Sequence, residues 1–150
     1  MTRKIVVFGA TGYTGELVAR ALVARGARPL LAARSAERVM ALAAQLGDLP
    51  TQLADVSKPE TVRALVERGD VLISTVGPFS RFGEPAVQAA IAARATYIDS
   101  TGEPSFIRRI FEEHHDAAVA SRTPLLTAFG YDWVPGNLAA ALALKEAGAA

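Results

Sequence analysis

The sequence contains no cysteine, and this absence removes several kinds of chemistry at once. Disulfide bonds, iron–sulfur clusters, zinc sites built from thiolates and cysteine nucleophiles are all excluded. No apolar run reaches the ~18 residues that a membrane-spanning helix needs. The N-terminus also shows no apolar stretch followed by a small-residue cleavage site. We therefore expect a cytoplasmic protein with no membrane partner.

An excess of charge of one sign is also absent. The formal net charge is +1 at pH 7, so nucleic acid is not expected as a partner. Hydrophobic residues make up 51% and charged residues 21% of the 150 residues, which is typical of a globular domain and not of a disordered chain. A chain of this length can bury roughly 70% of its unfolded surface, enough for a core without covalent cross-links.

Candidate catalytic and metal-binding side chains are scarce. His114 and His115 are adjacent inside an expected helix, where we expect one to pack and the other to be solvated. A zinc site would need further ligands at suitable spacing, and none is found. The Tyr-x-x-x-Lys pair of typical short-chain reductases is missing too, because Tyr13, Tyr97 and Tyr131 are not followed by lysine four positions later. The sequence therefore predicts no metal and leaves the catalytic residues unknown.

Short apolar runs alternate with longer helical patterns along the chain. Apolar runs without polar alternation indicate strands of a parallel sheet that is covered on both faces. This alternation predicts an α/β fold with a doubly wound, mostly parallel sheet, the Rossmann fold. The expected strands are residues 4–8, 29–33, 52–54, 71–76, 96–99 and 124–129, and the expected helices are 12–25, 36–46, 59–67, 84–94 and 104–121.

The end of the chain differs from the rest. An alanine- and leucine-rich helical run follows the segment GYDWVPGN, and no further strand comes after it. Two interpretations stay open: the helix begins a substrate domain that this chain lacks, or it packs on the sheet and completes the fold. The division adopted is a Rossmann domain over residues 1–130, followed by a C-terminal helix over residues 131–150 that begins a missing substrate domain.

The first expected strand runs directly into a glycine-rich turn, GATGYTG, at residues 9–15. Gly9 allows a sharp turn off the strand, Gly12 lets the backbone approach a pyrophosphate, and Gly15 lets the next helix pack against the sheet. Free N–H groups and the positive end of the helix dipole then face the phosphates, and the hydroxyls of Thr11 and Thr14 can add hydrogen bonds. The alternative is a tight structural turn that binds nothing.

The residue after the second expected strand bears on the choice of cofactor. NAD-dependent enzymes place an acidic residue there, about 20 residues past the glycines, to bind the ribose 2′-hydroxyl. This chain instead has Arg34 and Ser35, with Arg38 one helical turn further on. A guanidinium suits a 2′-phosphate because it is planar, always charged and able to make paired hydrogen bonds. These residues predict NADP as the cofactor; the alternative is that Arg34 is a solvated surface side chain.

Three further polar segments follow expected strands. Asp55 comes after the third strand, where it either accepts a hydrogen bond from the adenine amino group or caps the next helix. The fourth strand ends in residues 74–79, at the edge where open α/β sheets bind ligands, so we expect them beside the ribose and nicotinamide. Residues 97–103 form a polar cluster at the same edge.

Five segments resemble a known family in their sequences and in their order along the chain: GATGYTG, AARS, STVGPFSRFGEP, YIDSTGE and FGYDWVPGNLAAALA. The set is similar to the saccharopine dehydrogenase-like family of NADP-binding proteins, which includes trans-acting enoyl reductases. The resemblance implies a second, α+β domain that builds the substrate pocket and the contacts of a homodimer. It also implies that the pyrophosphate is lined by Gly9, Thr11, Gly12, Tyr13, Thr14 and Gly15, the adenosine ribose phosphate by Arg34 and Ser35, and the nicotinamide ribose by Thr75, Val76 and Gly77.

The leading interpretation is an NADP(H)-dependent oxidoreductase that transfers hydride to a small-molecule substrate, either an imine or an enoyl compound. The cofactor supplies the chemistry and the protein orients it. We expect this chain alone to bind the cofactor without turning over substrate. The alternative is an NADP(H)-sensing regulatory module, because sensors of the atypical short-chain type share the glycine loop and lack the tyrosine–lysine pair.

Overall fold

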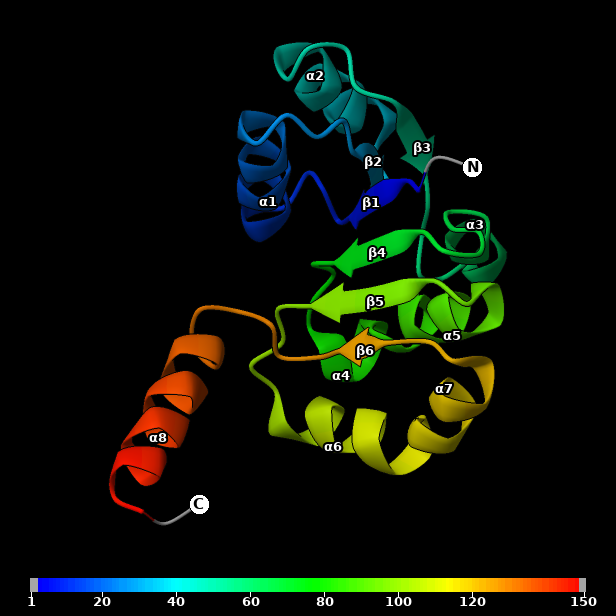
Figure 1. The fold of residues 1–150 in the computed structure, drawn as a ribbon. Helices are drawn as coiled ribbons and strands as arrows, with labels where there is room; N and C mark the ends of the chain where they lie inside the picture. The colour runs from blue at the N-terminus through cyan, green and yellow to red at the C-terminus, as the bar shows by residue number, and fades with distance from the viewer. Residues whose placement is uncertain (1–2, 149–150) are drawn as a thin grey trace.

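The computed structural model describes residues 3–148. Within that range, six strands form one parallel sheet in the order β3-β2-β1-β4-β5-β6 (Figure 1). This is the strand order of a doubly wound dinucleotide-binding fold, so the predicted Rossmann fold is confirmed. The strands are β1 (Ile5–Phe8), β2 (Leu30–Ala33), β3 (Thr51–Leu53), β4 (Val71–Ser74), β5 (Thr96–Asp99) and β6 (Leu125–Leu126).

Helices lie on both faces of the sheet (Figure 1). One face is covered by α1 (Tyr13–Ala24) and α2 (Ala36–Gln45). The other is covered by α3 (Pro59–Arg63), α4 (Phe79–Phe82), α5 (Glu84–Ala93) and α6 (Pro104–Glu113), with α7 (His115–Ser121) packed against α5. A last helix, α8 (Val134–Glu146), stands apart from the sheet.

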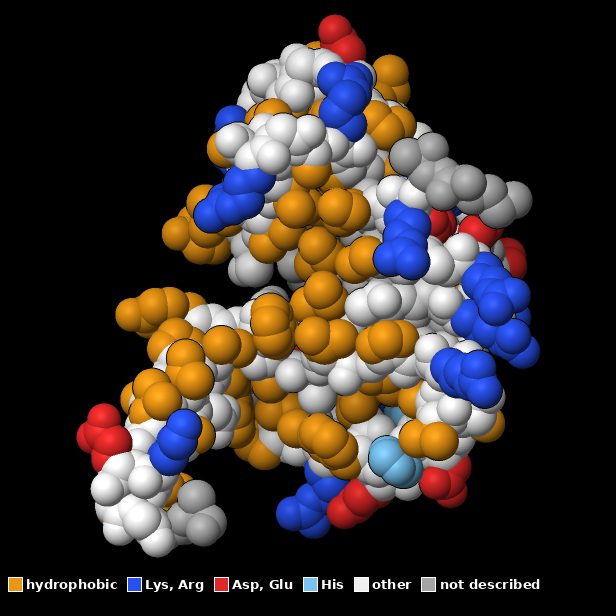
Figure 2. Space-filling model, in the orientation of Figure 1, with side chains coloured by type: hydrophobic (Ala, Val, Ile, Leu, Met, Phe, Trp, Pro, Cys, Tyr) orange, Lys and Arg blue, Asp and Glu red, His pale blue; other side chains and the backbone are white. Residues whose placement is uncertain are grey.

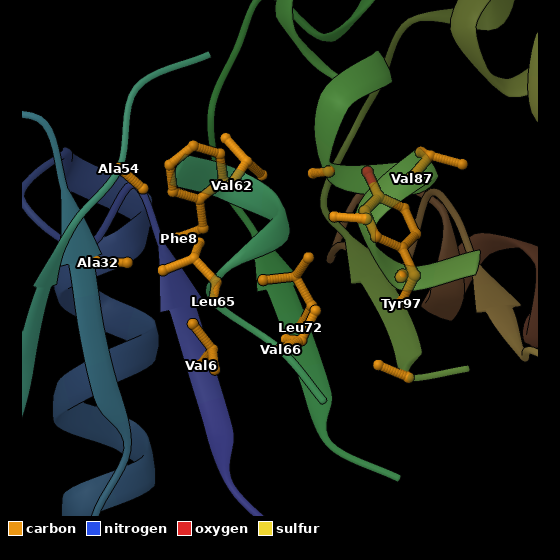
Figure 3. Packing of buried hydrophobic residues seen from close by; sticks show 14 of the residues in the cluster. Val6, Phe8, Ala32, Ala54, Val62, Leu65, Val66, Leu72, Val87 and Tyr97 are labelled. Atoms are coloured by element: carbon orange, nitrogen blue, oxygen red, sulfur yellow. The ribbon is translucent and has the colours of Figure 1, made fainter. Parts of the chain in front are cut away.

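The core divides into two clusters because successive strand residues point to opposite faces. On β1, Val6 and Phe8 belong to the larger cluster, whereas Val7 belongs to the smaller one. Figure 3 shows the larger cluster, in which Val62 and Leu65 lie over the side chains of the central strands. The smaller cluster joins β1 and β2 to α1 and α2.

The smaller cluster does not extend over β4 and β5, so this part of its sheet face is less buried. Ile73 on β4 and Ile98 on β5 are only partly buried, and neither belongs to that cluster. In the view of Figure 2, hydrophobic side chains gather across the middle of the molecule, where no helix passes in front of β4 and β5 in Figure 1.

Two helix predictions are wrong, and one helix was not predicted. The expected helix over 104–121 is wrong as a single element, since α6 ends at Glu113 and α7 begins at His115. His114 at this junction is partly buried with Nε2 3.1 Å from the Glu84 carboxylate, while His115 is exposed. The expected helix over 59–67 ends early, at Arg63, and α4 was not expected at all. The strands expected over 71–76 and 124–129 are also shorter in the structure than predicted.

The C-terminal helix exists but buries none of its residues. Its large apolar side chains Val134, Leu138, Leu142 and Leu144 are exposed, so it does not cover the sheet. Residues 149–150 of the expected helix, and residues 1–2 of the expected Rossmann domain, lie outside the described range. Among residues 3–148, no helix combines the length and the apolar character needed to cross a membrane.

Candidate functional site

The glycine-rich turn between β1 and α1 is tied to both neighbouring strands. The amides of Gly9 and Ala10 donate to the carbonyl oxygen of Ala32 on β2, at 2.9 and 3.1 Å. The hydroxyl of Thr75, just after β4, donates to the carbonyl oxygen of Phe8 at 3.0 Å. Gly9 has a φ of 87°, in the left-handed region that favours glycine. The turn therefore lies where the strand order reverses, which is where doubly wound sheets bind ligands.

The three glycines of the turn differ in what a side chain would meet. A Cβ on Gly9 would lie 2.8 Å from the Thr75 hydroxyl oxygen and 2.9 Å from Cγ2 of Val76. A Cβ on Gly15 would collide with the carbonyl oxygen of Gly9. A Cβ on Gly12 would have one neighbour within 4 Å, the Gly9 carbonyl oxygen at 3.3 Å. Internal packing thus requires glycine at positions 9 and 15, whereas the space in front of Gly12 is open to a ligand.

The N-terminus of α1 is open as well. The helix begins at Tyr13 after the N-cap residue Gly12, and no side chain caps it. Its first N–H groups have no partner inside the helix and carry a partial positive charge. Tyr13 and Thr14 are exposed. This end of the helix can therefore accept an anion such as a phosphate.

A pocket of about 480 Å³ lies at the carboxyl ends of β1, β2 and β4. This volume is in the range of roughly 300–1,000 Å³ that is typical of small-molecule sites. Of the predicted cofactor-binding residues, the pocket brings together Gly9, Thr11, Gly12, Arg34, Asp55, Thr75, Val76 and Gly77, while Tyr13, Thr14, Gly15 and Ser35 do not line it. Other lining residues, which the motifs did not assign to the site, are Phe8, Ala33, Ala54, Val56, Ser57 and Phe82, and Arg38 also lines the pocket.

Arg34 follows β2 directly, and Arg38 lies in the first turn of α2, after Glu37. Arg34 is exposed and forms no hydrogen bond with another residue in the range 3–148. The Ser35 hydroxyl is the N-cap of α2, where it accepts a hydrogen bond from the Arg38 amide at 3.4 Å. Nη2 of Arg38 donates to the carbonyl oxygen of Thr11 at 2.7 Å. Ser35 therefore acts in the local structure of α2, and Arg34 is free to meet a ligand.

Asp55 is held by its neighbours in a turn after β3. Its Oδ1 accepts hydrogen bonds from the Ser57 amide and the Ser57 hydroxyl, both at 2.8 Å. These hydrogen bonds, the backbone one first, lower the pKa of the Asp55 carboxyl, and the charge of Arg34 adds to the effect. The alternative that Asp55 caps the next helix is wrong, because the N-cap of α3 is Lys58. Asp55 thus presents an ionised carboxylate at the edge of the pocket at neutral pH.

The polar cluster after β5 holds the loop after β4 in place. The carboxylate of Glu103 accepts hydrogen bonds from the amides of Phe79 and Ser80, at 2.6 and 2.9 Å. Hydrogen bonding by Ser80, with its side chain first, and by the Phe79 amide lowers the pKa of Glu103. Glu103 therefore fixes the segment that follows Gly77, one of the pocket residues.

We expect Glu103→Gln to reduce the free energy of unfolding by roughly 1 kcal/mol at pH 7, after allowance for solvent screening. Because the pKa of Glu103 is lowered in the folded state, its stabilising effect is present above the unfolded pKa of about 4.3. The effect disappears as the pH falls through the folded pKa. Denaturant unfolding of both proteins between pH 7 and pH 3 measures this difference.

The control is Glu67→Gln, which changes an exposed glutamate away from the pocket. Its difference from the unaltered protein should stay nearly constant over the same pH range. A Glu103→Gln difference that is equally independent of pH would contradict the role assigned to this carboxylate.

Buried polar groups lie beneath the same edge of the sheet. Asp99 is 1% exposed and accepts hydrogen bonds from the Thr101 amide, the Thr127 hydroxyl and the Ala128 amide. The hydroxyl of Tyr97 is buried without a hydrogen-bond partner in the described part of the chain. Burial first, and then the charge of Asp99, raises the pKa of Tyr97 well above its ordinary value. Asp99 holds loops together, and neither Asp99 nor Tyr97 lines the pocket, so neither is placed to exchange a proton with a ligand there.

The groups around the pocket match the parts of a phosphorylated dinucleotide. The open N-terminus of α1 and the space in front of Gly12 suit a pyrophosphate. The exposed guanidinium of Arg34 suits a further phosphate, and the residue directly after β2 is this arginine and not a carboxylate. The donor set therefore fits NADP.

Comparison with known proteins gives close relatives. A Mycobacterium leprae trans-acting enoyl reductase is 41% identical over 140 residues, which cover 89% of this chain and 34% of that protein. A Mycobacterium tuberculosis protein, provisionally named a trans-acting enoyl reductase, is 42% identical over 140 residues, which cover 89% of this chain and 33% of that protein. The chain thus spans about a third of the length of the curated relatives it matches.

Solved structures confirm the fold. Apo saccharopine dehydrogenase (L-Glu forming) from Saccharomyces cerevisiae aligns with a TM-score of 0.79 and 20% identity, covering 97% of this chain and 31% of that one. Triphenylmethane reductase from Citrobacter sp., solved in complex with NADP(H), aligns with a TM-score of 0.62 and 20% identity, covering 83% of this chain and 48% of that one.

A family description covers most of the chain. Residues 5–126 match the family described as "Saccharopine dehydrogenase NADP binding domain". The match includes the glycine-rich turn, all six strands and every residue that lines the pocket. The chain belongs to the saccharopine dehydrogenase NADP-binding domain family, and its cofactor is NADP.

Proposed function

We propose that this chain holds the cofactor of an NADP(H)-dependent oxidoreductase that reduces an enoyl substrate. One observation carries the proposal: an exposed arginine, Arg34, lines the same pocket as the glycine-rich turn, at the position where an NAD-dependent enzyme has a carboxylate. The names of the relatives favour an enoyl substrate over an imine, since the proteins at 40–42% identity are named enoyl reductases.

Each part of the pocket has its own role in this proposal. The open N-terminus of α1 binds the pyrophosphate, which occupies the space in front of Gly12, and Arg34 binds the 2′-phosphate. Asp55 accepts a hydrogen bond from the adenine amino group through the carboxylate oxygen that Ser57 leaves free. Val76 and Gly77 border the nicotinamide ribose. Bound NADPH supplies the hydride, and these residues orient it and exclude water.

The substrate-binding part belongs to the same proposal. We place the boundary near residue 130 and assign α8 to the side that meets the substrate domain. The support is that α8 exposes Leu138, Leu142 and Leu144, and that the relatives are about three times as long as the matched region. Consistent with this division, we expect the 150-residue chain to bind NADPH without turning over an enoyl substrate.

The test of the proposal is the choice of cofactor. Each arginine hydrogen bond to a charged group contributes roughly 1.5–3 kcal/mol. A net preference of about 2–2.8 kcal/mol corresponds to NADPH binding about thirty- to hundredfold more tightly than NADH. Arg34→Ala should remove most of this preference by weakening NADPH binding and leaving NADH nearly unchanged. Calorimetric dissociation constants of both nucleotides for both proteins measure the effect.

A matched control is Arg68→Ala, because Arg68 is also exposed but lines no part of the pocket. It should leave both dissociation constants unchanged. The preference should also shrink as salt is added, since it rests on charge. Equal affinities for NADPH and NADH in the unaltered chain would overturn the proposal.

A further inference from the structure

Arg38 connects two parts of the pocket that are distant in the sequence. It lies in the first turn of α2, yet its Nη2 donates to the carbonyl oxygen of Thr11 at 2.7 Å, across 27 positions of the chain. This distance is at the short end for an N–H···O hydrogen bond, as expected when the donor is charged. The glycine-rich turn is therefore anchored to α2 as well as to β2 and β4.

The carbonyl of Thr11 belongs to the peptide unit that ends in the Gly12 amide. That amide donates to the carbonyl oxygen of Gly9 at 3.0 Å. Because a peptide unit is planar, fixing its carbonyl also fixes the direction of its N–H. Arg38 and Gly9 thus hold one peptide unit from opposite ends, directly beside the open space in front of Gly12.

The charge of Arg38 has no carboxylate partner within residues 3–148. Arg20, which also reaches from one helix toward the next, pairs with Glu16 at 2.7 Å and donates to Gln45 at 3.2 Å. Arg38 forms no such ion pair, and its side chain lines the pocket beside Arg34. In the described part of the chain, its one side-chain hydrogen bond goes to the backbone of the turn.

We propose that Arg38 is a positioning residue that holds the glycine-rich turn in the shape that receives the pyrophosphate. This inference rests on the proposed function, because it assigns the turn to the pyrophosphate. Arg34 then acts on the 2′-phosphate, which NADPH alone carries, whereas Arg38 acts through a part of the site that NADPH and NADH share. Removal of Arg38 therefore weakens the binding of both NADPH and NADH, whereas removal of Arg34 weakens the binding of NADPH alone.

The experiment compares Arg38→Met, Arg38→Lys and the control Arg20→Met. Methionine keeps an unbranched apolar stem but no donor, while lysine keeps a donor and the charge. We expect Arg38→Met to weaken NADH binding about tenfold, equivalent to 1.4 kcal/mol, and NADPH binding by at least as much. Arg38→Lys should recover most of the NADH affinity, and Arg20→Met should change neither nucleotide.

Two further measurements distinguish a positioning role of Arg38 from a loss of the fold. The melting temperature of Arg38→Met should match that of Arg20→Met, while the amide resonance of Gly12 shifts in Arg38→Met alone. NADH affinity within twofold of the unaltered chain in Arg38→Met, or an equal loss in Arg20→Met, would overturn the inference while leaving the proposed function intact. Failure of the unaltered chain to bind either nucleotide would instead overturn the proposed function.

Discussion

Gly12→Val will abolish measurable NADPH binding while the domain stays folded. The backbone of Gly12 is extended, with φ −84° and ψ 165°, so a β-branched residue can adopt it. Its Cβ would meet only the Gly9 carbonyl oxygen, at 3.3 Å. The added methyl groups would instead extend into the space that the phosphates need. We expect a loss in affinity of at least about a hundredfold, or ~2.8 kcal/mol.

Gly136→Val is the matched control for this substitution. A Cβ on Gly136 meets nothing within 4 Å, and the residue lies on α8, away from the pocket. It should leave the NADPH dissociation constant unchanged. Calorimetric titration together with a thermal melt distinguishes lost binding from lost folding. Unchanged affinity in a folded Gly12→Val protein would place the phosphates elsewhere.

Gly15→Ala should damage the fold itself. Here the added Cβ would collide with the backbone carbonyl of Gly9 and would lie 2.8 Å from the hydroxyl oxygen of Thr75. A backbone neighbour cannot rotate away, so α1 must shift from the sheet. Overpacking of this kind costs about 1–3 kcal/mol, and we expect the upper end. The melting temperature should fall by roughly 6–12 °C, at about 2–4 °C for each kcal/mol in a domain of this size.

Gly136→Ala provides the comparison, because both glycines lie within helices but only Gly15 is enclosed. In the control, alanine should improve helix propensity by up to about 1 kcal/mol without lowering the melting temperature. A Gly15→Ala protein that melts at the same temperature as the unaltered chain would show that α1 can move without loss.

The fold could be predicted because its signals are local. Each strand is a short apolar run, and the turn at residues 9–15 carries its own glycines. The existence of α4 could not be predicted in this way, because the carboxylate that binds its first amides belongs to Glu103, after the next strand. The break at His114 was missed because the apolar spacing of Phe106, Ile110 and Ala118 continues across it.

The site was predictable to a similar degree and for the same reason. Gly9 and Arg34 follow strands directly, and the carboxyl ends of parallel strands meet at one edge. The hydrogen bond from Arg38 to Thr11 depends on how closely α2 approaches the turn, which no local pattern records. Phe82 lines the pocket and lies on α4, so it could not be assigned to the site without predicting that helix.

The isolation of α8 bears on how this chain unfolds. A helix of 13 residues that buries none of them gains almost nothing from tertiary packing, and isolated helices of that length are marginal in water. Its helix–coil equilibrium is therefore largely independent of the sheet. Heating should first produce a gradual loss of ellipticity from α8 and then one sharp transition from the Rossmann core. A two-state analysis of the whole signal would understate the cooperativity of that core.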